Sequence, residues 1–201
     1  MAEGGQPASG GSRASVVLFG HSYIRRLGEY ARRQAQEVGQ DPLRMTDADV
    51  QFLGVGGATL QPRPRGRWIR NSLPELARHH PKVVILHMGE NDLEYASAEE
   101  IAREILLLRD VIVEEYHCQV YVLQLVPWPK HPESTIAAVR AVNTQLEAKL
   151  PVNCYWKYCC GISSVNQSYF RHDLAHFNDT GYKQYARSIR TLVGRAVRHI
   201  T

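Results

Sequence analysis

The chain has 201 residues, of which 44% are apolar and 22% are charged, and its net charge at pH 7 is +4. These values are ordinary for a soluble globular protein, and the length suits one α/β domain with a real core. The mild positive charge permits contact with an anionic surface but does not require one. No stretch approaches the ~18 consecutive apolar residues that would indicate a membrane-spanning helix.

Residues 1–14 are rich in glycine, serine and alanine, which predicts a flexible tail or linker ahead of one domain over residues 15–201. The first apolar run, residues 16–19, is too short for the core of a secretory signal peptide, so we expect a cytoplasmic protein. The four cysteines match no zinc-binding spacing. We expect no metal and no other cofactor.

Five short runs rich in apolar and β-branched residues predict buried strands. They cover residues 15–19, 50–53, 82–88, 119–126 and 153–158.

Helical patterns fill most of the intervals between these strands. Residues 24–37, 135–150 and about 180–200 each predict a helix from apolar residues at helical spacing. Ser72 and Glu75 form a capping-box pattern that opens a short helix ending near His80, and Ser97 and Glu100 form another. After Ser97 an apolar stripe follows at helical spacing, made of Ile101, Ile105, Leu108 and Ile112.

Strands and helices thus alternate along the chain. This alternation predicts an α/β fold in which a five-stranded parallel sheet has helices on both faces, joined by right-handed crossovers. Sites in such folds form at the carboxyl ends of the strands, where the strand order reverses.

Polar motifs follow four of the strands and so are expected to meet at that edge. Ser22, after the first strand, has the chemistry of a nucleophile. His176 can serve as its base, and Asp173, three residues earlier, can orient that imidazole. Gly57 and Asn91, after the second and third strands, can donate hydrogen bonds to an oxyanion together with the N–H of Ser22.

Each of these residues also has a purely structural interpretation. Ser22 can be the N-cap of the first helix, and Asp173 or Asp179 can cap the last one. Gly57 and Asn91 can simply be turn residues. The order and joint presence of all four motifs favour the catalytic interpretation.

The same residues resemble the four sequence blocks of the SGNH hydrolases, also called GDSL-type esterases. Ser22, Gly57, Asn91 and His176 match the four residues that give the family its name, and Asp173 completes the D-x-x-H pattern. The resemblance covers nearly the whole chain from residue 16 to residue 200. It implies a three-layer α/β/α sandwich with a flavodoxin-like sheet and metal-free ester hydrolysis, without fixing the substrate.

One position departs from the family pattern. The residue before the nucleophile is usually aspartate and here it is His21, which can change how the nucleophile turn is held. Gly20-His21-Ser22 and the following Tyr-Ile-Arg-Arg-Leu are also similar to the esterase domain in first-open-reading-frame proteins of LINE-type retrotransposons.

Two further groups of residues suggest partners. Tyr95 and Trp128, on loops at the predicted active edge, are candidates for a shallow acyl pocket for a small acyl ester or a lipid. Four arginines beside Trp68 can hold phosphates of nucleic acid or anionic membrane weakly, or form an ordinary solvated surface. They are Arg63, Arg65, Arg67 and Arg70, on an expected loop over residues 61–70.

The sequence therefore predicts a serine esterase acting on short-chain acyl esters through an acyl-enzyme. Two alternatives remain: the same fold used as a nucleic-acid- or protein-binding module, and a structural domain with a vestigial site. No expected catalytic position is missing, which favours the esterase.

Overall fold

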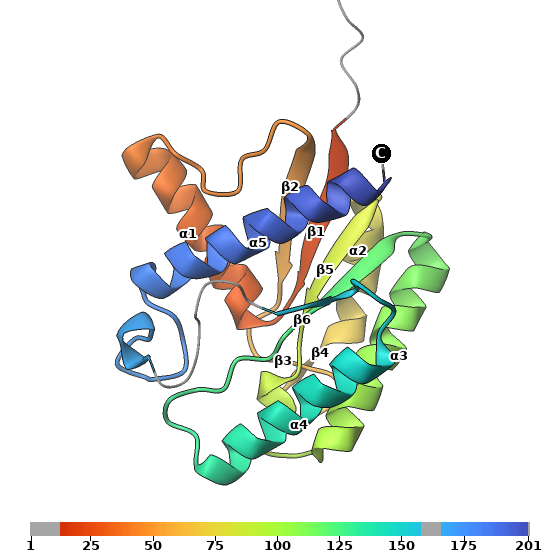
Figure 1. The fold of residues 1–201 in the computed structure, drawn as a ribbon, viewed down its shortest axis with the longest axis vertical. Helices are drawn as coiled ribbons and strands as arrows, with labels where there is room; N and C mark the ends of the chain where they lie inside the picture. The colour runs from red at the N-terminus through yellow and green to blue at the C-terminus, as the bar shows by residue number, and fades with distance from the viewer. Residues whose placement is uncertain (1–12, 158–165, 201) are drawn as a thin grey trace, which may run out of the picture.

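The structure, a computed structural model, describes residues 13–157 and 166–200. A five-stranded parallel sheet in the order β2-β1-β5-β6-β7 forms its centre (Figure 1). The strands are β1 (Ala14–Gly20), β2 (Ala48–Gly54), β5 (Val83–His87), β6 (Gln119–Leu123) and β7 (Tyr155–Trp156). The predicted α/β fold class is confirmed.

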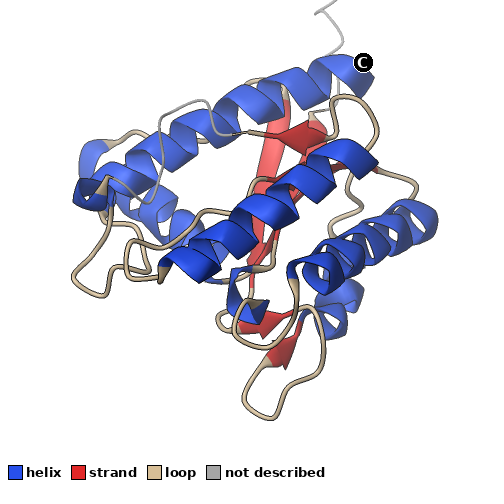
Figure 2. Cartoon of the chain, turned by 60° about the horizontal axis from the view of Figure 1, so that its bottom comes forward, coloured by secondary structure: helices blue, strands red, loops and turns tan. Residues whose placement is uncertain are grey.

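Helices cover both faces of the sheet, as the view in Figure 2 also shows. Val16 and Leu18 of β1 point into a core with α1 (Ser22–Val38) and α5 (Asp179–Ile200). Val17 and Phe19 point the other way. They pack against α2 (Leu73–Arg78), α3 (Ala98–Tyr116) and α4 (Glu133–Lys149). Alternate residues of one strand therefore build two separate cores, because side chains alternate across a sheet.

The predicted elements agree with these bounds to within a few residues. The strand expected over residues 153–158 is the two-residue β7, and residue 158 lies outside the described part. β1 begins at Ala14, the residue that was expected to end the tail, and residues 1–12, on which the rest of that prediction falls, lie outside the described part. In the described residues no helix is both long and apolar enough to cross a membrane.

One of the two predicted capping boxes forms. Ser97 accepts a hydrogen bond from the Glu100 N–H at 3.2 Å, and the Glu100 carboxylate accepts one from the Ser97 N–H at 2.9 Å. The box predicted at Ser72 and Glu75 is wrong. Ser72 ends a 3₁₀ turn (Ile69–Ser72) and has the helical backbone values φ −98° and ψ 0°, so its hydroxyl makes no capping bond. The Glu75 carboxylate pairs with Arg78 instead.

The arginine-rich segment is more ordered than the predicted loop. Arg67 and Trp68 form the short strand β4 (Arg67–Trp68), which pairs in parallel with β3 (Ala58–Thr59). Two residues are too few to produce a periodic sequence signal, so these strands could not be predicted. The indole N–H of Trp68 donates to the Leu60 carbonyl at 3.0 Å, which holds this half-buried ring against the domain.

The strand order reverses at β1. The chain runs from β1 outward to β2 and then returns to the other side of β1 as β5. The loops after β1 and β5 therefore leave the sheet next to each other at the switch point where α/β folds bind ligands. Ser22 follows β1 and Asn91 follows β5, so the topology brings these two motifs together.

Candidate active site

Ser22 is the first residue of α1, directly after β1. The interpretation of Ser22 as the N-cap is wrong, because His21 occupies that position with an extended backbone, and its Nδ1 accepts from the Tyr23 N–H at 3.4 Å. The hydroxyl of Ser22 is thus not used as a cap. Its N–H belongs to the first turn, where helix N–H groups lack intrahelical acceptors and favour negative charge.

A continuous chain of hydrogen bonds joins Ser22 to a carboxylate. Ser22 Oγ lies 3.3 Å from His176 Nε2, and His176 Nδ1 lies 2.8 Å from Asp173 Oδ2. Because a carboxylate accepts at Nδ1, that nitrogen carries the proton and Nε2 presents its lone pair to Ser22. The arrangement can therefore take a proton from the serine hydroxyl.

A tight turn over residues 173–176 holds the imidazole in this orientation. Asp173 Oδ1 accepts from the N–H groups of Ala175 and His176, both at 2.9 Å, and Leu174 adopts a φ of 50° that is unusual for a non-glycine residue. Partial burial opposes the charge of Asp173, but these two N–H groups and the imidazole hold its pKa well below its usual range. Asp173 is therefore an ionised partner for His176.

The structure also decides which residue caps the last helix. Asn178 Oδ1 accepts from the Gly181 N–H at 3.0 Å, so neither Asp173 nor Asp179 provides the N-cap bond of α5. Asp179 instead pairs with Arg33 of α1 at 2.5 Å. The carboxylate of Asp173 is thus committed to the turn and the imidazole.

Tyr23, which sequence reasoning did not single out, connects the start of α1, where Ser22 lies, to the loop that carries His176. Its hydroxyl donates to the Ala175 carbonyl at 2.7 Å, and its ring stacks on Phe177 with the centroids 4.5 Å apart. Tyr23 therefore contacts Ala175 and Phe177, the residues on both sides of His176. An aromatic residue in a helix gives no sequence signal for such a contact.

The pKa of His176 is lowered. Pairing with a carboxylate usually raises the pKa of a histidine, and on that ground the sequence predicts a raised value. The structure contradicts this direction. Desolvation of the half-buried ring lowers the pKa most, and the nearby charge of Arg26 lowers it further, which outweighs the opposite effect of Asp173.

Gly57 and Asn91 line one cavity, whose lining does not include Ser22 or His176. Gly57 has φ 69°, and a Cβ built on it would meet no atom within 4 Å, so its backbone faces open space. The Asn91 amide donates one hydrogen bond to the Ala58 carbonyl at 2.8 Å, which orients the group. An amide nitrogen carries two hydrogens, so a second donor remains for a ligand.

Asp92 ties these two loops together. Both oxygens of its buried carboxylate accept from the Leu60 N–H, at 3.1 and 3.2 Å. Burial raises the pKa of Asp92 to about 6, although the Leu60 hydrogen bond opposes the rise. Asp92 thereby fixes the β3 loop that carries Gly57 against the turn Glu90–Asp92 that carries Asn91.

The cavity has a volume of about 500 Å³. The candidate pocket residues Tyr95 and Trp128 both line this cavity, and so do Arg63 and Arg65. Arg67 instead lines a neighbouring cavity together with Trp68. Arg70 lines neither of the two cavities. The Arg63 guanidinium lies 5.0 Å from the centre of the Tyr95 ring. Glu90, which is bonded to His21, the residue before Ser22, also lines the cavity.

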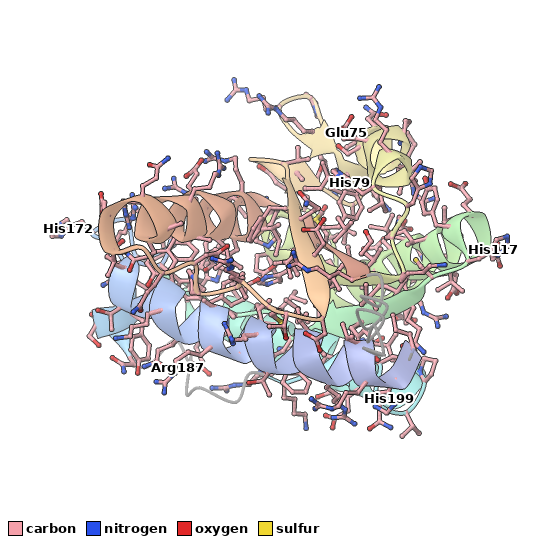
Figure 3. The ribbon with its side chains drawn as sticks, turned by 90° about the horizontal axis from the view of Figure 1, so that it is seen from above. Glu75, His79, His117, His172, Arg187 and His199 are labelled. Carbon is pink, nitrogen blue, oxygen red and sulfur yellow. The ribbon has the colours of Figure 1, made fainter. Side chains whose placement is uncertain are left out.

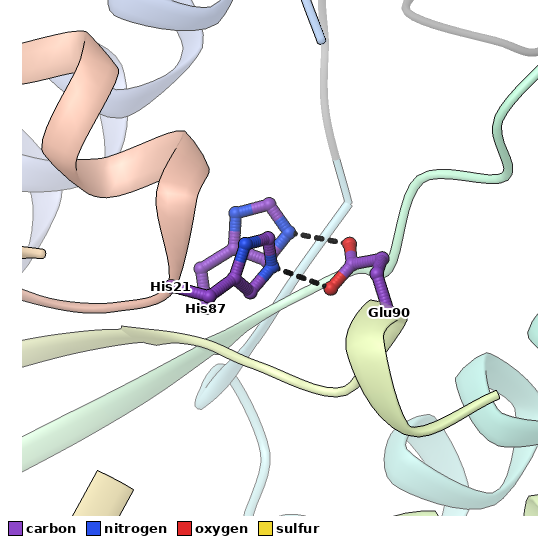
Figure 4. Close-up of side chains that lie close together, drawn as sticks. All are labelled: His21, His87 and Glu90. Atoms are coloured by element: carbon purple, nitrogen blue, oxygen red, sulfur yellow. Dashed lines mark hydrogen bonds and ion pairs between the residues drawn. The ribbon is translucent and has the colours of Figure 1, made fainter. Parts of the chain in front are cut away.

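Two of the nine histidines form a buried cluster with Glu90, shown in Figure 4. His21 Nε2 and His87 Nε2 each lie 2.7 Å from one oxygen of the Glu90 carboxylate. By contrast, His117, His172 and His199 lie at the outside of the molecule (Figure 3). Sequence reasoning noted His21 as a departure but missed Glu90 and His87, because a buried acid in a turn-rich motif resembles an ordinary turn residue.

Among the described residues, this cluster is the one group of at least three side chains close enough to share a metal ion. However, the 2.7 Å separations are those of charge-assisted hydrogen bonds, and an ion would have to displace both imidazole protons. The geometry is that of a hydrogen-bonded network.

Comparison with known proteins shows that the fold is shared with solved structures. No protein-family model matches the chain, and no curated protein sequence matches it. Solved structures do match. A lipase/acylhydrolase from Enterococcus faecalis is 20% identical with a TM-score of 0.62, and the match covers 90% of this chain and 96% of that one.

Two other solved structures are similar over comparable lengths. A member of the lipolytic G-D-S-L family from Veillonella parvula is 14% identical with a TM-score of 0.68, covering 90% of this chain and 99% of that one. A carbohydrate acetylesterase family member from Sinorhizobium meliloti is 12% identical with a TM-score of 0.64, covering 92% and 99%. At these identities the chain shares the fold of GDSL/SGNH-type lipases and carbohydrate esterases.

Proposed function

We propose that the chain, as one domain over residues 15–201, is a serine esterase that hydrolyses short-chain acyl esters. The observation that carries this proposal is the continuous chain Asp173–His176–Ser22, with separations of 2.8 and 3.3 Å. Names of similar structures, which include an acetyl xylan esterase and an acetyl esterase, support a small acyl group. The similarity to retrotransposon-encoded esterase domains stays a prediction.

The positions of Ser22, His176 and Asp173 support the following reaction. Ser22 Oγ attacks the ester carbonyl while His176 Nε2 takes its proton, and the oxyanion accepts from Asn91 and from the N–H groups of Gly57 and Ser22. The carbon–oxygen bond to the alcohol breaks, and His176 returns the proton to the departing oxygen. Water then attacks the acyl-serine with His176 as base, which releases the acid and restores Ser22.

The substrate class is tested with p-nitrophenyl esters of increasing chain length. A cavity of about 500 Å³ between Tyr95 and Trp128 accommodates a small acyl group or one short chain of a lipid. We therefore expect kcat/KM to be highest for acetyl to butyryl esters and to fall for long chains. Equal or rising values for long chains would show that the cavity does not limit the acyl group.

Replacing Asn91 with alanine is expected to lower kcat by about 10²- to 10³-fold with little change in KM, because an oxyanion donor acts mainly in the transition state. The measurement is steady-state hydrolysis of p-nitrophenyl acetate. Asn71→Ala, at an exposed position outside the cavity lining, is the matched control. A change confined to KM would instead assign Asn91 to substrate binding.

The pH dependence should reflect the lowered pKa of His176. The base must be neutral, so kcat/KM is lost as the pH falls through this pKa, and half-maximal activity is expected below the ~6.5 of an unperturbed histidine. Arg26→Gln should move the acid limb to higher pH, because the Arg26 charge disfavours the imidazolium. Arg25→Gln, which removes an exposed charge paired with Glu29, is the control. An acid limb that stays in place in Arg26→Gln would contradict this account.

A weaker second activity rests on the arginine-rich segment. Arg65 and Arg67 are exposed, whereas Arg63 and Arg70 are half-buried, so we propose that only about two arginines contact nucleic acid or anionic membrane. The logarithm of the affinity for single-stranded RNA should then fall with the logarithm of the salt concentration by about 0.7 per contact.

The double variant Arg65→Ala/Arg67→Ala should abolish this binding. Arg78→Ala/Arg140→Ala, which removes two ion-paired surface charges, should retain it. Lack of binding by the unmodified protein to both RNA and anionic vesicles at low salt would rule the activity out.

A further inference from the structure

The hydroxyl of Ser22 lies between two imidazoles. His176 Nε2 is 3.3 Å from Oγ on one side, and His21 Nδ1 is 3.5 Å from Oγ on the other. Each of these histidines is bonded through its far nitrogen to a carboxylate, Asp173 at 2.8 Å and Glu90 at 2.7 Å. Two histidine–carboxylate pairs therefore converge on one oxygen atom.

The hydrogen-bond network around Glu90 decides which nitrogen of His21 carries the proton. Glu90 Oε1 accepts from His87 Nε2 at 2.7 Å and from the Val126 N–H at 3.0 Å, and Oε2 faces His21 Nε2 (Figure 4). A carboxylate can only accept, so His21 Nε2 carries a proton, and because Nδ1 accepts from the Tyr23 N–H, Nδ1 carries a lone pair. That lone pair faces the Tyr23 N–H and the Ser22 hydroxyl.

The same network keeps Glu90 charged. Complete burial disfavours its carboxylate, but His87 and His21 hold the pKa of Glu90 well below its usual range. Burial is also the main cause that lowers the pKa of His87, so this ring stays neutral and acts as a hydrogen-bond donor. Glu90 can therefore stabilise a positive charge on His21, as Asp173 can on His176.

We propose that His21, oriented by Glu90, is a second acceptor of the Ser22 proton, so that Ser22 is activated by two histidine–carboxylate pairs. The inference rests on the proposed nucleophilic role of Ser22. The 3.5 Å separation is long for a hydrogen bond, but catalytic hydrogen bonds of ligand-free enzymes are often long and shorten when substrate binds.

The two histidines differ in what they can do after the attack. The side chain of His176 is 25% exposed, whereas that of His21 is 1% exposed. Only His176 can therefore protonate an alkoxide leaving group. His21 can accept the Ser22 proton, but it can support a complete reaction only where the leaving group departs as a stable anion.

A fluorophosphonate probe isolates this first step. Ser22 Oγ forms a bond to phosphorus, the phosphorus–fluorine bond breaks, fluoride leaves as the anion, and the proton from Oγ stays on the accepting imidazole until solvent removes it. No group has to protonate the leaving atom. The rate of phosphonylation, followed by intact-protein mass spectrometry, thus reports the proton acceptors of Ser22 alone.

The variants compared are His176→Ala, His176→Ala/His21→Asn, and Ser22→Ala. Asparagine is chosen because it retains an acceptor that caps α1 but cannot take a proton. We expect His176→Ala to be labelled at least about tenfold faster than the His21→Asn double variant, given that a general base typically contributes 10²- to 10⁴-fold. His176→Ala/His172→Asn, which changes an exposed histidine, should label like His176→Ala (Figure 3).

A second pair of measurements does not depend on the folding of the His21 variant. Imidazole ¹⁵N shifts of the unmodified protein should show His21 protonated at Nε2 and unprotonated at Nδ1. Glu90→Gln places an amide donor against Nε2 and should invert this tautomer, and His176→Ala/Glu90→Gln should then label as slowly as the His21→Asn double variant.

The outcomes distinguish the proposal of a second proton acceptor from the esterase proposal. Equal labelling of His176→Ala and its His21→Asn double variant, absence of labelling in His176→Ala, or protonation of His21 at Nδ1 in the unmodified protein would each overturn the second acceptor. The esterase proposal survives these results as long as Ser22→Ala is unlabelled and inactive. Undiminished labelling and turnover of Ser22→Ala would instead overturn the proposed function itself.

Discussion

Ser22→Ala is expected to lower kcat for p-nitrophenyl acetate by about 10⁴- to 10⁶-fold, the range found when serine hydrolases lose the nucleophile. The reason is that, in the part of the chain that the structure describes, Ser22 Oγ is the hydroxyl hydrogen-bonded to His176 Nε2, at 3.3 Å. The fold should be unaffected, because alanine favours helices and the lost hydrogen bonds are long.

The measurement combines burst and steady-state kinetics with circular dichroism. Ser72→Ala is the matched control, since Ser72 is half-buried and makes no capping bond. It should retain full turnover. A Ser22→Ala variant that keeps turnover within tenfold of the unmodified protein would place the nucleophile elsewhere.

Asp173→Asn is expected to lower kcat by about 10⁴-fold while the turn around it persists. The new amide oxygen can still accept from the N–H groups of Ala175 and His176, which now bond to Asp173 Oδ1. The new amide nitrogen, however, would donate to His176 Nδ1 and force the proton onto Nε2. His176 would then present a proton to Ser22 in place of a lone pair.

The loss should appear in kcat, with the circular dichroism spectrum unchanged. Asp179→Asn provides the control, because this neighbouring carboxylate is exposed and pairs with Arg33 without touching the imidazole. If Asp173→Asn and Asp179→Asn lose activity equally and slightly, the contribution of Asp173 is confined to holding the turn.

The residue before Ser22 is His21, at a position where the SGNH hydrolases that the sequence resembles usually have aspartate. In this chain the position is buried, caps α1, and is tied to Glu90 and through it to His87. The turn that carries Ser22 is therefore held by a network that runs from the end of β1 to the end of β5. This network connects the two loops that flank the switch point of the sheet.

Local patterns in the sequence predicted much of the fold and most of the candidate site residues. Apolar runs that alternate with helical stripes predicted the parallel sheet. The joint presence of four polar motifs identified the candidate site residues Ser22, Gly57, Asn91 and His176. These features can be recognised in the sequence because periodicity and strand-to-loop transitions are properties of neighbouring residues. The order in which the motifs follow the strands then predicts the edge of the sheet where they meet.

Only the tertiary structure decided how these residues are held and charged. The bond between His21 and Glu90 joins residues 69 positions apart, and that between Tyr23 and Ala175 joins residues 152 positions apart, so neither has a local signature. The direction of the His176 pKa was predicted wrongly for the same reason. Its pairing with Asp173 is visible in the sequence, whereas the burial and the Arg26 charge that outweigh it arise only when α1 and the last loop pack together.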